Sequence, residues 1–122
     1  MNDRIIDILV AGFDGWEQCL PKACGSFPAP EIAFMRHGHY YGGMAIPRYT
    51  KDLNAINALI KSKSCNLEFR IAFGEELSDY LKIFSDSEDS LYALYDKVTK
   101  IASVSAKDLC DVFLKTMVKA LN

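Results

Sequence analysis

Two cysteines and two histidines within one stretch of the chain are the residue types best suited to chemistry. Four residues separate Cys19 from Cys24, and a single residue separates His37 from His39. Zinc is bound tetrahedrally by thiolate and imidazole ligands, but finger-type sites place about three to five residues between their histidines. The ligand types therefore permit a zinc site, whereas the spacing of the histidines argues against one.

A cysteine nucleophile is another use for the same residues, because a thiolate needs an adjacent base such as His37 or His39. Nothing in the spacing pairs one cysteine with one histidine. The sequence also contains no nucleophile elbow, no phosphate-binding glycine loop and no HExxH motif. We therefore expect a protein without catalytic activity and without a cofactor. A small zinc-binding protein or hydrolase is kept as an alternative.

Aromatic and basic side chains form the best candidate binding surface. The run HGHYY, residues 37–41, is central to it. Aromatic side chains give a large contact area at small entropic cost, and they can fill a partner's pockets or stack on bases. In the alternative interpretation the two tyrosines alternate between core and solvent in a hairpin, and Trp16 belongs to the core. The candidate residues are Trp16, Arg36, His37, His39, Tyr40, Tyr41, Arg48 and Tyr49.

Acidic residues between positions 75 and 89 form another candidate surface, either as a solvated face or as a patch that occupies a basic surface of a partner. The formal net charge of the chain is only −2, so we do not expect mimicry of DNA by the whole protein or direct binding to nucleic acid. The acidic residues are Glu75, Glu76, Asp79, Asp86, Glu88 and Asp89.

Length and composition indicate one globular domain over residues 1–122, since half of the residues are hydrophobic and a quarter are charged. No run approaches the roughly 20 apolar residues that span a bilayer. Asp7 interrupts the first apolar stretch, so we expect no signal peptide and a cytoplasmic protein. In that reducing compartment the four cysteines are expected to stay free, with Cys110 as a small buried hydrophobe.

The first half of the chain predicts two helices and a hairpin. Residues 3–11 form the first helix, with Ile5, Ile8 and Leu9 on one face and Ile6 and Val10 beside it. Residues 20–30, which contain three prolines, form a loop. Residues 32–36 and 40–46 pair across a turn at residues 37–39. Residues 51–62 form the central helix, with Thr50 as its N-cap.

The second half predicts strands and a last helix. Asn66–Phe73 alternates between apolar and polar residues, which is typical of a half-buried strand, and Gly74 ends it. Residues 91–95 and 98–104 are also expected to be strands, while residues 80–84 fit either a strand or a helical turn. Ser105 and Asp108 form a capping box for a C-terminal helix. The fold class is therefore α+β, with a small, mainly antiparallel sheet packed with N-terminal, central and C-terminal helices.

Three segments together resemble the phage ABA sandwich family, a group of small phage and prophage proteins. They are IIDILVAGFDGW (5–16), PRYTKDLNAINALI (47–60) and AKDLCDVFLKTM (106–117). Residues 17–46 and 74–89 depart from the family pattern. The resemblance implies an α/β/α sandwich-like fold and a phage accessory role, and it transfers no catalytic residue.

We therefore expect a non-enzymatic phage protein that binds and inhibits or redirects a host factor, such as a bacterial anti-phage defence complex. The segments that depart from the family pattern would carry this function, because loops carry specificity on a common scaffold. The partner is expected to be a host protein or a protein–nucleic-acid complex in the bacterial cytoplasm, and self-association is open. The alternative is a protein that sequesters a nucleotide signal by aromatic stacking.

Overall fold

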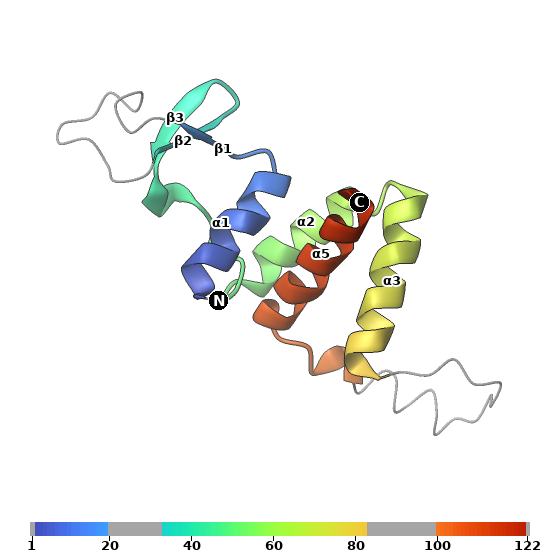
Figure 1. The fold of residues 1–122 in the computed structure, drawn as a ribbon. Helices are drawn as coiled ribbons and strands as arrows, with labels where there is room; N and C mark the ends of the chain where they lie inside the picture. Colours follow the sequence, from blue (N-terminus) through green and yellow to red (C-terminus); the bar gives the residue numbers. More distant parts are fainter. Residues whose placement is uncertain (1, 20–32, 83–99, 122) are drawn as a thin grey trace, which may run out of the picture.

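The structure is a computed structural model that describes residues 2–19, 33–82 and 100–121 (Figure 1). Its elements in chain order are α1 (Asp3–Phe13), β1 (Glu17–Cys19), β2 (Ala33–Arg36), β3 (His39–Gly42), the 3-10 helix η2 (Gly43–Ala45), α2 (Leu53–Lys63), α3 (Leu67–Leu81) and α5 (Ala106–Leu121). The three strands form one antiparallel sheet in the order β1-β2-β3. The predicted α+β class, with its small antiparallel sheet, is confirmed.

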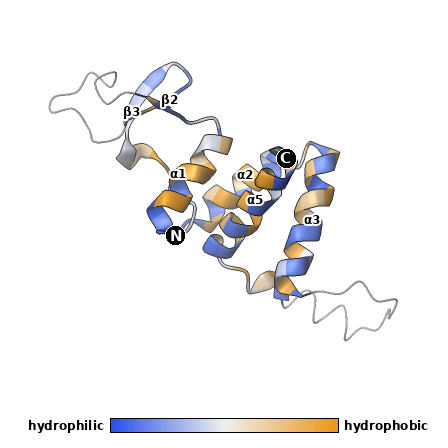
Figure 2. Cartoon of the chain, in the orientation of Figure 1, coloured by the Kyte–Doolittle hydropathy of each residue, from blue (hydrophilic) through white to orange (hydrophobic). Residues whose placement is uncertain are grey.

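Helix α5 is the centre of the helical part, because α1, α2 and α3 all pack against it. The sheet lies beyond α1 at one end of the molecule, and α3 lies at the opposite edge (Figure 1). Hydrophobic and hydrophilic residues share each helix, as expected where one side is buried (Figure 2). The core consists of Ile6, Val10, Ala11, Phe34, Ile46, Tyr49, Ile56, Leu59, Ala106, Cys110 and Phe113.

The first helix is confirmed, but its buried face is not the predicted apolar stripe. Ile5 and Leu9 are 49% and 44% exposed, whereas Asp7 is buried. Asp7 is satisfied because its Oδ1 atom accepts a 2.8 Å hydrogen bond from the backbone N–H of Thr50, and Arg4 lies 3.6 Å from its other oxygen. A carboxylate can be buried when it is paired and hydrogen-bonded in this way. The buried face of α1 consists of Ile6, Asp7, Val10 and Ala11, so Ile5 and Leu9 lie on its outer side.

The central helix is also confirmed, but Thr50 is not its N-cap. The cap is Asp52, whose Oδ1 atom accepts hydrogen bonds from the backbone N–H groups of Asn54 and Ala55 at 3.1 and 3.2 Å. Thr50 is buried in the turn before the helix and donates its backbone N–H to Asp7. The helix therefore begins at Leu53, two residues later than predicted.

The predicted strand at residues 66–73 is wrong, since this stretch opens α3. Asn66 caps the helix by accepting a hydrogen bond from the backbone N–H of Phe69 at 3.2 Å. Phe69 and Phe73 are one helical turn apart, and both pack against the core. Gly74 lies inside the helix and does not end it.

The C-terminal helix begins as predicted. Ser105 and Asp108 form the reciprocal capping box, with both hydrogen bonds at 3.2 Å. Cys110 is buried, as predicted, and burial together with the nearby Asp7 raises its thiol pKa to about 12.

The structure describes residues 100–104 of the strand predicted at 98–104. The prediction is wrong there, because residues 100–102 are helical. The loop predicted at 20–30 and the strand predicted at 91–95 lie outside the described residues. The segment at residues 80–84 was expected to be either a strand or a helical turn. Its residues 80 and 81 are the last two of α3, and residues 83 and 84 lie outside the described residues.

No helix within the described ranges is long and apolar enough to cross a membrane.

Candidate partner-binding surface

The predicted hairpin is present and ends in a two-residue turn. Arg36 pairs with His39, and the residues between them, His37 and Gly38, have φ angles of 52° and 78°. Two successive positive φ angles are typical of the type I′ turn, whose twist matches that of the flanking strands. The second arm is shorter than predicted, because β3 ends at Gly42 and η2 follows.

The strand alternation divides the candidate residues between two faces of the sheet. Phe34 is paired with Tyr41, and Arg36 with His39, so these four side chains share one face. Tyr40 is paired with Met35 and belongs to the other face.

Trp16 joins the face that carries Arg36 and Tyr41. The Arg36 guanidinium carbon lies 5.0 Å from the centroid of the Trp16 ring, and the rings of Trp16 and Tyr41 meet edge to face at 5.4 Å. Trp16 is half-buried and also packs against the core. We call Trp16, Arg36, His39 and Tyr41 the aromatic face.

Asp14 anchors the aromatic face to the helices. Its Oδ2 atom lies 3.4 Å from Nη1 of Arg36 and accepts a 2.5 Å hydrogen bond from the hydroxyl of Tyr49. Burial raises the pKa of the Tyr49 hydroxyl above its usual value, and the bond to Asp14 adds to this shift. Sequence reasoning missed Asp14, although its position in a Gly-flanked turn two residues before Trp16 is a usable signal.

The other four predicted residues do not belong to the aromatic face. Tyr49 is 1% exposed, so it supports the surface from below and is not part of it. Arg48 is exposed, and its carbonyl accepts the backbone N–H groups of Lys51 and Asp52 in the turn before α2. Tyr40 is 49% exposed, on the opposite side of the sheet. His37 lies at the turn and accepts a 3.3 Å hydrogen bond from Nε of Arg36.

An apolar groove of about 390 Å³ continues from the aromatic face. It runs between α1 and the sheet, and Trp16 belongs to both features. The exposed Ile5 and Leu9 extend the apolar surface along α1. The groove is lined by Ile8, Leu9, Gly12, Phe13, Trp16, Gln18 and Phe34.

The predicted zinc ligands do not come together among the described residues. Cys19 pairs with Ala33 of β2, whereas His39 pairs with Arg36, three residues further along the same strand. Cys19 and His39 are therefore about 10 Å apart in the direction of the strands. Cys24 lies outside the described residues. Within the described ranges, no group of three His, Cys, Asp or Glu side chains is arranged to hold a metal ion.

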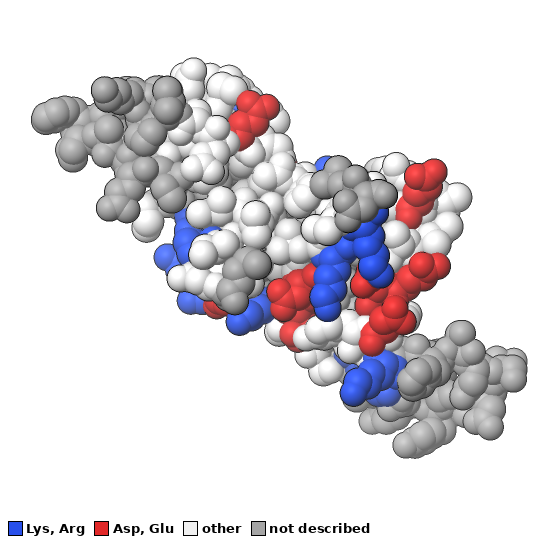
Figure 3. All heavy atoms as spheres, viewed as in Figure 1, with Lys and Arg blue, Asp and Glu red and all other residues white. Residues whose placement is uncertain are grey.

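The described part of the acidic segment lies on α3. Glu75 and Asp79 are exposed, whereas Glu76 forms an ion pair with Lys119 of α5. On the face seen in Figure 3, acidic side chains gather over α3 with basic side chains beside them. Asp86, Glu88 and Asp89 lie outside the described residues.

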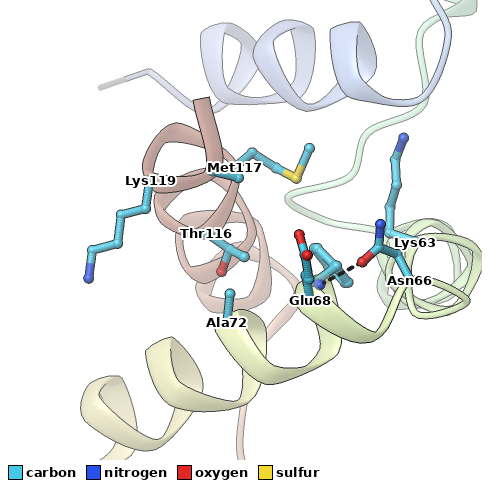
Figure 4. A pocket seen from close by; sticks show the side chains of 9 residues that line it. Lys63, Asn66, Glu68, Ala72, Thr116, Met117 and Lys119 are labelled. Carbon is cyan, nitrogen blue, oxygen red and sulfur yellow. Dashed lines mark hydrogen bonds between the residues drawn. The ribbon is translucent and has the colours of Figure 1, made fainter. Parts of the chain in front are cut away.

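A separate cavity of about 430 Å³ lies between α3 and α5 (Figure 4). Its apolar wall includes Phe69 and Met117. The ammonium groups of Lys63 and Lys119 point away from it (Figure 4). None of the residues of the aromatic face lines this cavity.

No protein-family model, curated protein or solved structure matches the chain. The resemblance to the phage ABA sandwich family therefore stays a prediction.

Proposed function

We propose that this protein is a non-enzymatic binding module of phage origin that attaches to a host protein and inhibits or redirects it, a bacterial anti-phage defence complex being one case. The observation that carries the binding role is the continuity of the aromatic face with the apolar groove through Trp16. The phage origin depends on the sequence resemblance alone.

The aromatic face has the composition of an interface centre. Tryptophan, tyrosine and arginine are enriched among the residues that dominate binding energy in protein complexes. Here Arg36 and Tyr41 both contact the Trp16 ring before a partner arrives. Because Asp14 also holds Arg36, few side-chain rotamers remain to be ordered on binding, which favours affinity.

The groove favours a protein partner over a nucleotide. Its lining is apolar apart from Gln18, so it suits an inserted aliphatic or aromatic side chain. A nucleotide would need an uncovered ring for stacking and a free cation for its phosphate. At the groove, Arg36 lies over the Trp16 ring and is paired with Asp14, and Tyr49 is buried. Tyr40 and Arg48 are exposed, but neither belongs to the aromatic face or lines the groove. The nucleotide alternative therefore receives less support.

The exposed acids of α3 supply another contact region in this proposal. Glu75 and Asp79 are available to a basic partner surface. Glu76 is less suitable for mutation, because its ion pair with Lys119 joins α3 to α5.

The adjacent tyrosines of β3 provide a matched test. Tagged wild-type protein is used to capture partners from the lysate of a bacterial host, and the identified partner is purified for titration. Tyr41→Ala is expected to weaken binding about tenfold or more, because it removes an aromatic contact at the centre of the proposed surface. Tyr40→Ala, on the opposite face of the same strand, is the control and should bind like wild type.

Inhibition is tested with the same partner. The activity of the partner should fall when wild-type protein or the Tyr40→Ala variant is added. The same activity should persist when an equal amount of the Tyr41→Ala variant is added. Circular dichroism of each variant confirms that the fold is retained. Equal loss of binding in both variants, or the absence of any specific partner, would overturn the proposal.

A further inference from the structure

Helix α3 has an apolar outer face that is not covered by any other part of residues 2–19, 33–82 and 100–121. Phe69 and Phe73 pack inward, whereas Leu67 and Ile71 are 60% and 55% exposed. A Cβ atom built on Gly74 would meet nothing within 4 Å, so the helix is also open at that position. The outer side of α3 faces away from α5 at the edge of the molecule (Figure 1).

The outer residues follow the spacing of a coiled-coil seam. Their positions advance by four, three and four along the chain, which matches successive d, a, d and a positions of a heptad. These residues are Leu67, Ile71, Gly74 and Ser78. Leucine at d with isoleucine at a favours two parallel strands. Gly74 and Ser78 are small enough to let a second helix approach closely.

The charged residues beside the seam are complementary to those of a second copy. Arg70 and Glu75 are exposed and occupy the g and e positions. Neither forms an ion pair with another described side chain. In a parallel two-fold pair, Arg70 of each copy faces Glu75 of the other, so two such pairs form. An antiparallel arrangement would instead bring Glu68 near Glu75 of the other copy, and like charges would repel.

We infer that α3 pairs in parallel with α3 of a second copy of this chain, through the seam of Leu67, Ile71, Gly74 and Ser78. The helix is already held by α5, so association does not have to form it from coil. The contact involves about two heptads on one helix, which is a small interface. Dimerisation is therefore expected to be weak and dependent on protein concentration.

The charge pattern gives a direct test by analytical ultracentrifugation of the full chain over a concentration series. Arg70→Glu and Glu75→Arg should each raise the dissociation constant of the dimer about fivefold to tenfold, because two attractive pairs become repulsive. The double variant restores both pairs with reversed sign and should return the constant to near its wild-type value. Val118→Glu, at a 54% exposed position on α5, is the control for an added surface charge.

The orientation is tested by cross-linking. Ser78→Cys, with the exposed Cys65 replaced by serine, should form a disulfide between copies under mild oxidation, because a parallel pair brings the two Ser78 positions together. Asp79→Cys in the same background is the control and should cross-link poorly. A wild-type chain that stays monomeric up to the highest soluble concentration, or a double variant that does not recover dimerisation, would overturn the inference. Neither result bears on partner binding by the aromatic face.

Discussion

Tyr49 and Asp14 are joined by a hydrogen bond of 2.5 Å, although 35 residues separate them in the chain. The same Oδ2 atom of Asp14 lies 3.4 Å from Nη1 of Arg36. One carboxylate therefore connects the turn after α1, the end of β2 and the segment before α2. This arrangement holds the sheet against the helices, and it fixes the position of the aromatic face.

Replacing Tyr49 by phenylalanine should lower the free energy of unfolding by about 1 to 2 kcal/mol, because a hydrogen bond to a charged group is lost while the buried ring remains. Denaturant unfolding at neutral pH measures this change. Tyr40→Phe is the control, since Tyr40 is exposed on the outer face of β3, and its stability should match that of wild type. Equal stability of all three proteins would contradict the anchoring role of Asp14.

Replacing Arg36 by glutamine should change the environment of Trp16, which is the only tryptophan in the chain. The variant keeps a polar side chain but removes the cation above the indole ring and the charge beside Asp14. We expect a shift in tryptophan emission and a loss of about 1 kcal/mol of stability. Arg36→Lys should retain part of both effects, because lysine keeps the charge but cannot stack as a planar group. An unchanged emission spectrum in Arg36→Gln would contradict the contact.

Local signals in the sequence were sufficient to predict the hairpin and the first residues of α5. Gly38 can adopt the positive φ angle of the turn, and Ser105 with Asp108 forms a cap from residues three apart. These features depend only on neighbouring residues. The strand prediction at residues 66–73 failed because phenylalanines four apart satisfy both an alternating and a helical pattern. The N-cap residue Asn66 was the local signal that favoured the helix.

The candidate site could be predicted only in part. Trp16, Arg36 and Tyr41 were proposed from their residue types, and the structure brings them together. The burial of Tyr49 and the role of Asp14 depend on contacts between distant segments, which no local pattern reports. The apolar groove was missed for a similar reason. Its lining on α1 includes Leu9, which is exposed because α1 buries Ile6, Asp7, Val10 and Ala11 instead of the predicted stripe.

The helical assignment of α3 predicts that Gly74→Ala stabilises the protein. Gly74 is exposed inside the helix, and a Cβ atom there meets no neighbour within 4 Å. Alanine at such a position should raise the free energy of unfolding by about 0.5 to 1 kcal/mol, because it restricts the unfolded chain and favours the helix. Thermal unfolding in dilute solution measures the gain. Gly38→Ala is the opposite control: its φ of 78° disfavours alanine, so that variant should be less stable. Destabilisation by Gly74→Ala would contradict the helix.

The contact between Tyr80 and Asp108 predicts a pH-dependent link between α3 and α5. The pKa of Asp108 is lowered, first because the Tyr80 hydroxyl donates a hydrogen bond to its carboxylate and then because Ser105 also donates to it. A carboxyl group whose folded pKa is lower than its unfolded pKa stabilises the protein above the unfolded value, near 3.9 for aspartate. That stabilisation is lost as the pH falls through the lower folded value.

Comparison of wild type with Tyr80→Phe isolates this effect, because the variant keeps the ring and Asp108 but removes the donor hydroxyl. The difference in free energy of unfolding should be constant between about pH 5 and 7 and should shrink as the pH falls below about 4. Urea unfolding at a series of pH values measures it. In the Asp108→Asn background the group no longer titrates, so the effect of Tyr80→Phe should not vary with pH. A difference that persists unchanged at pH 2.5 would mean that the hydroxyl acts without the charge of Asp108.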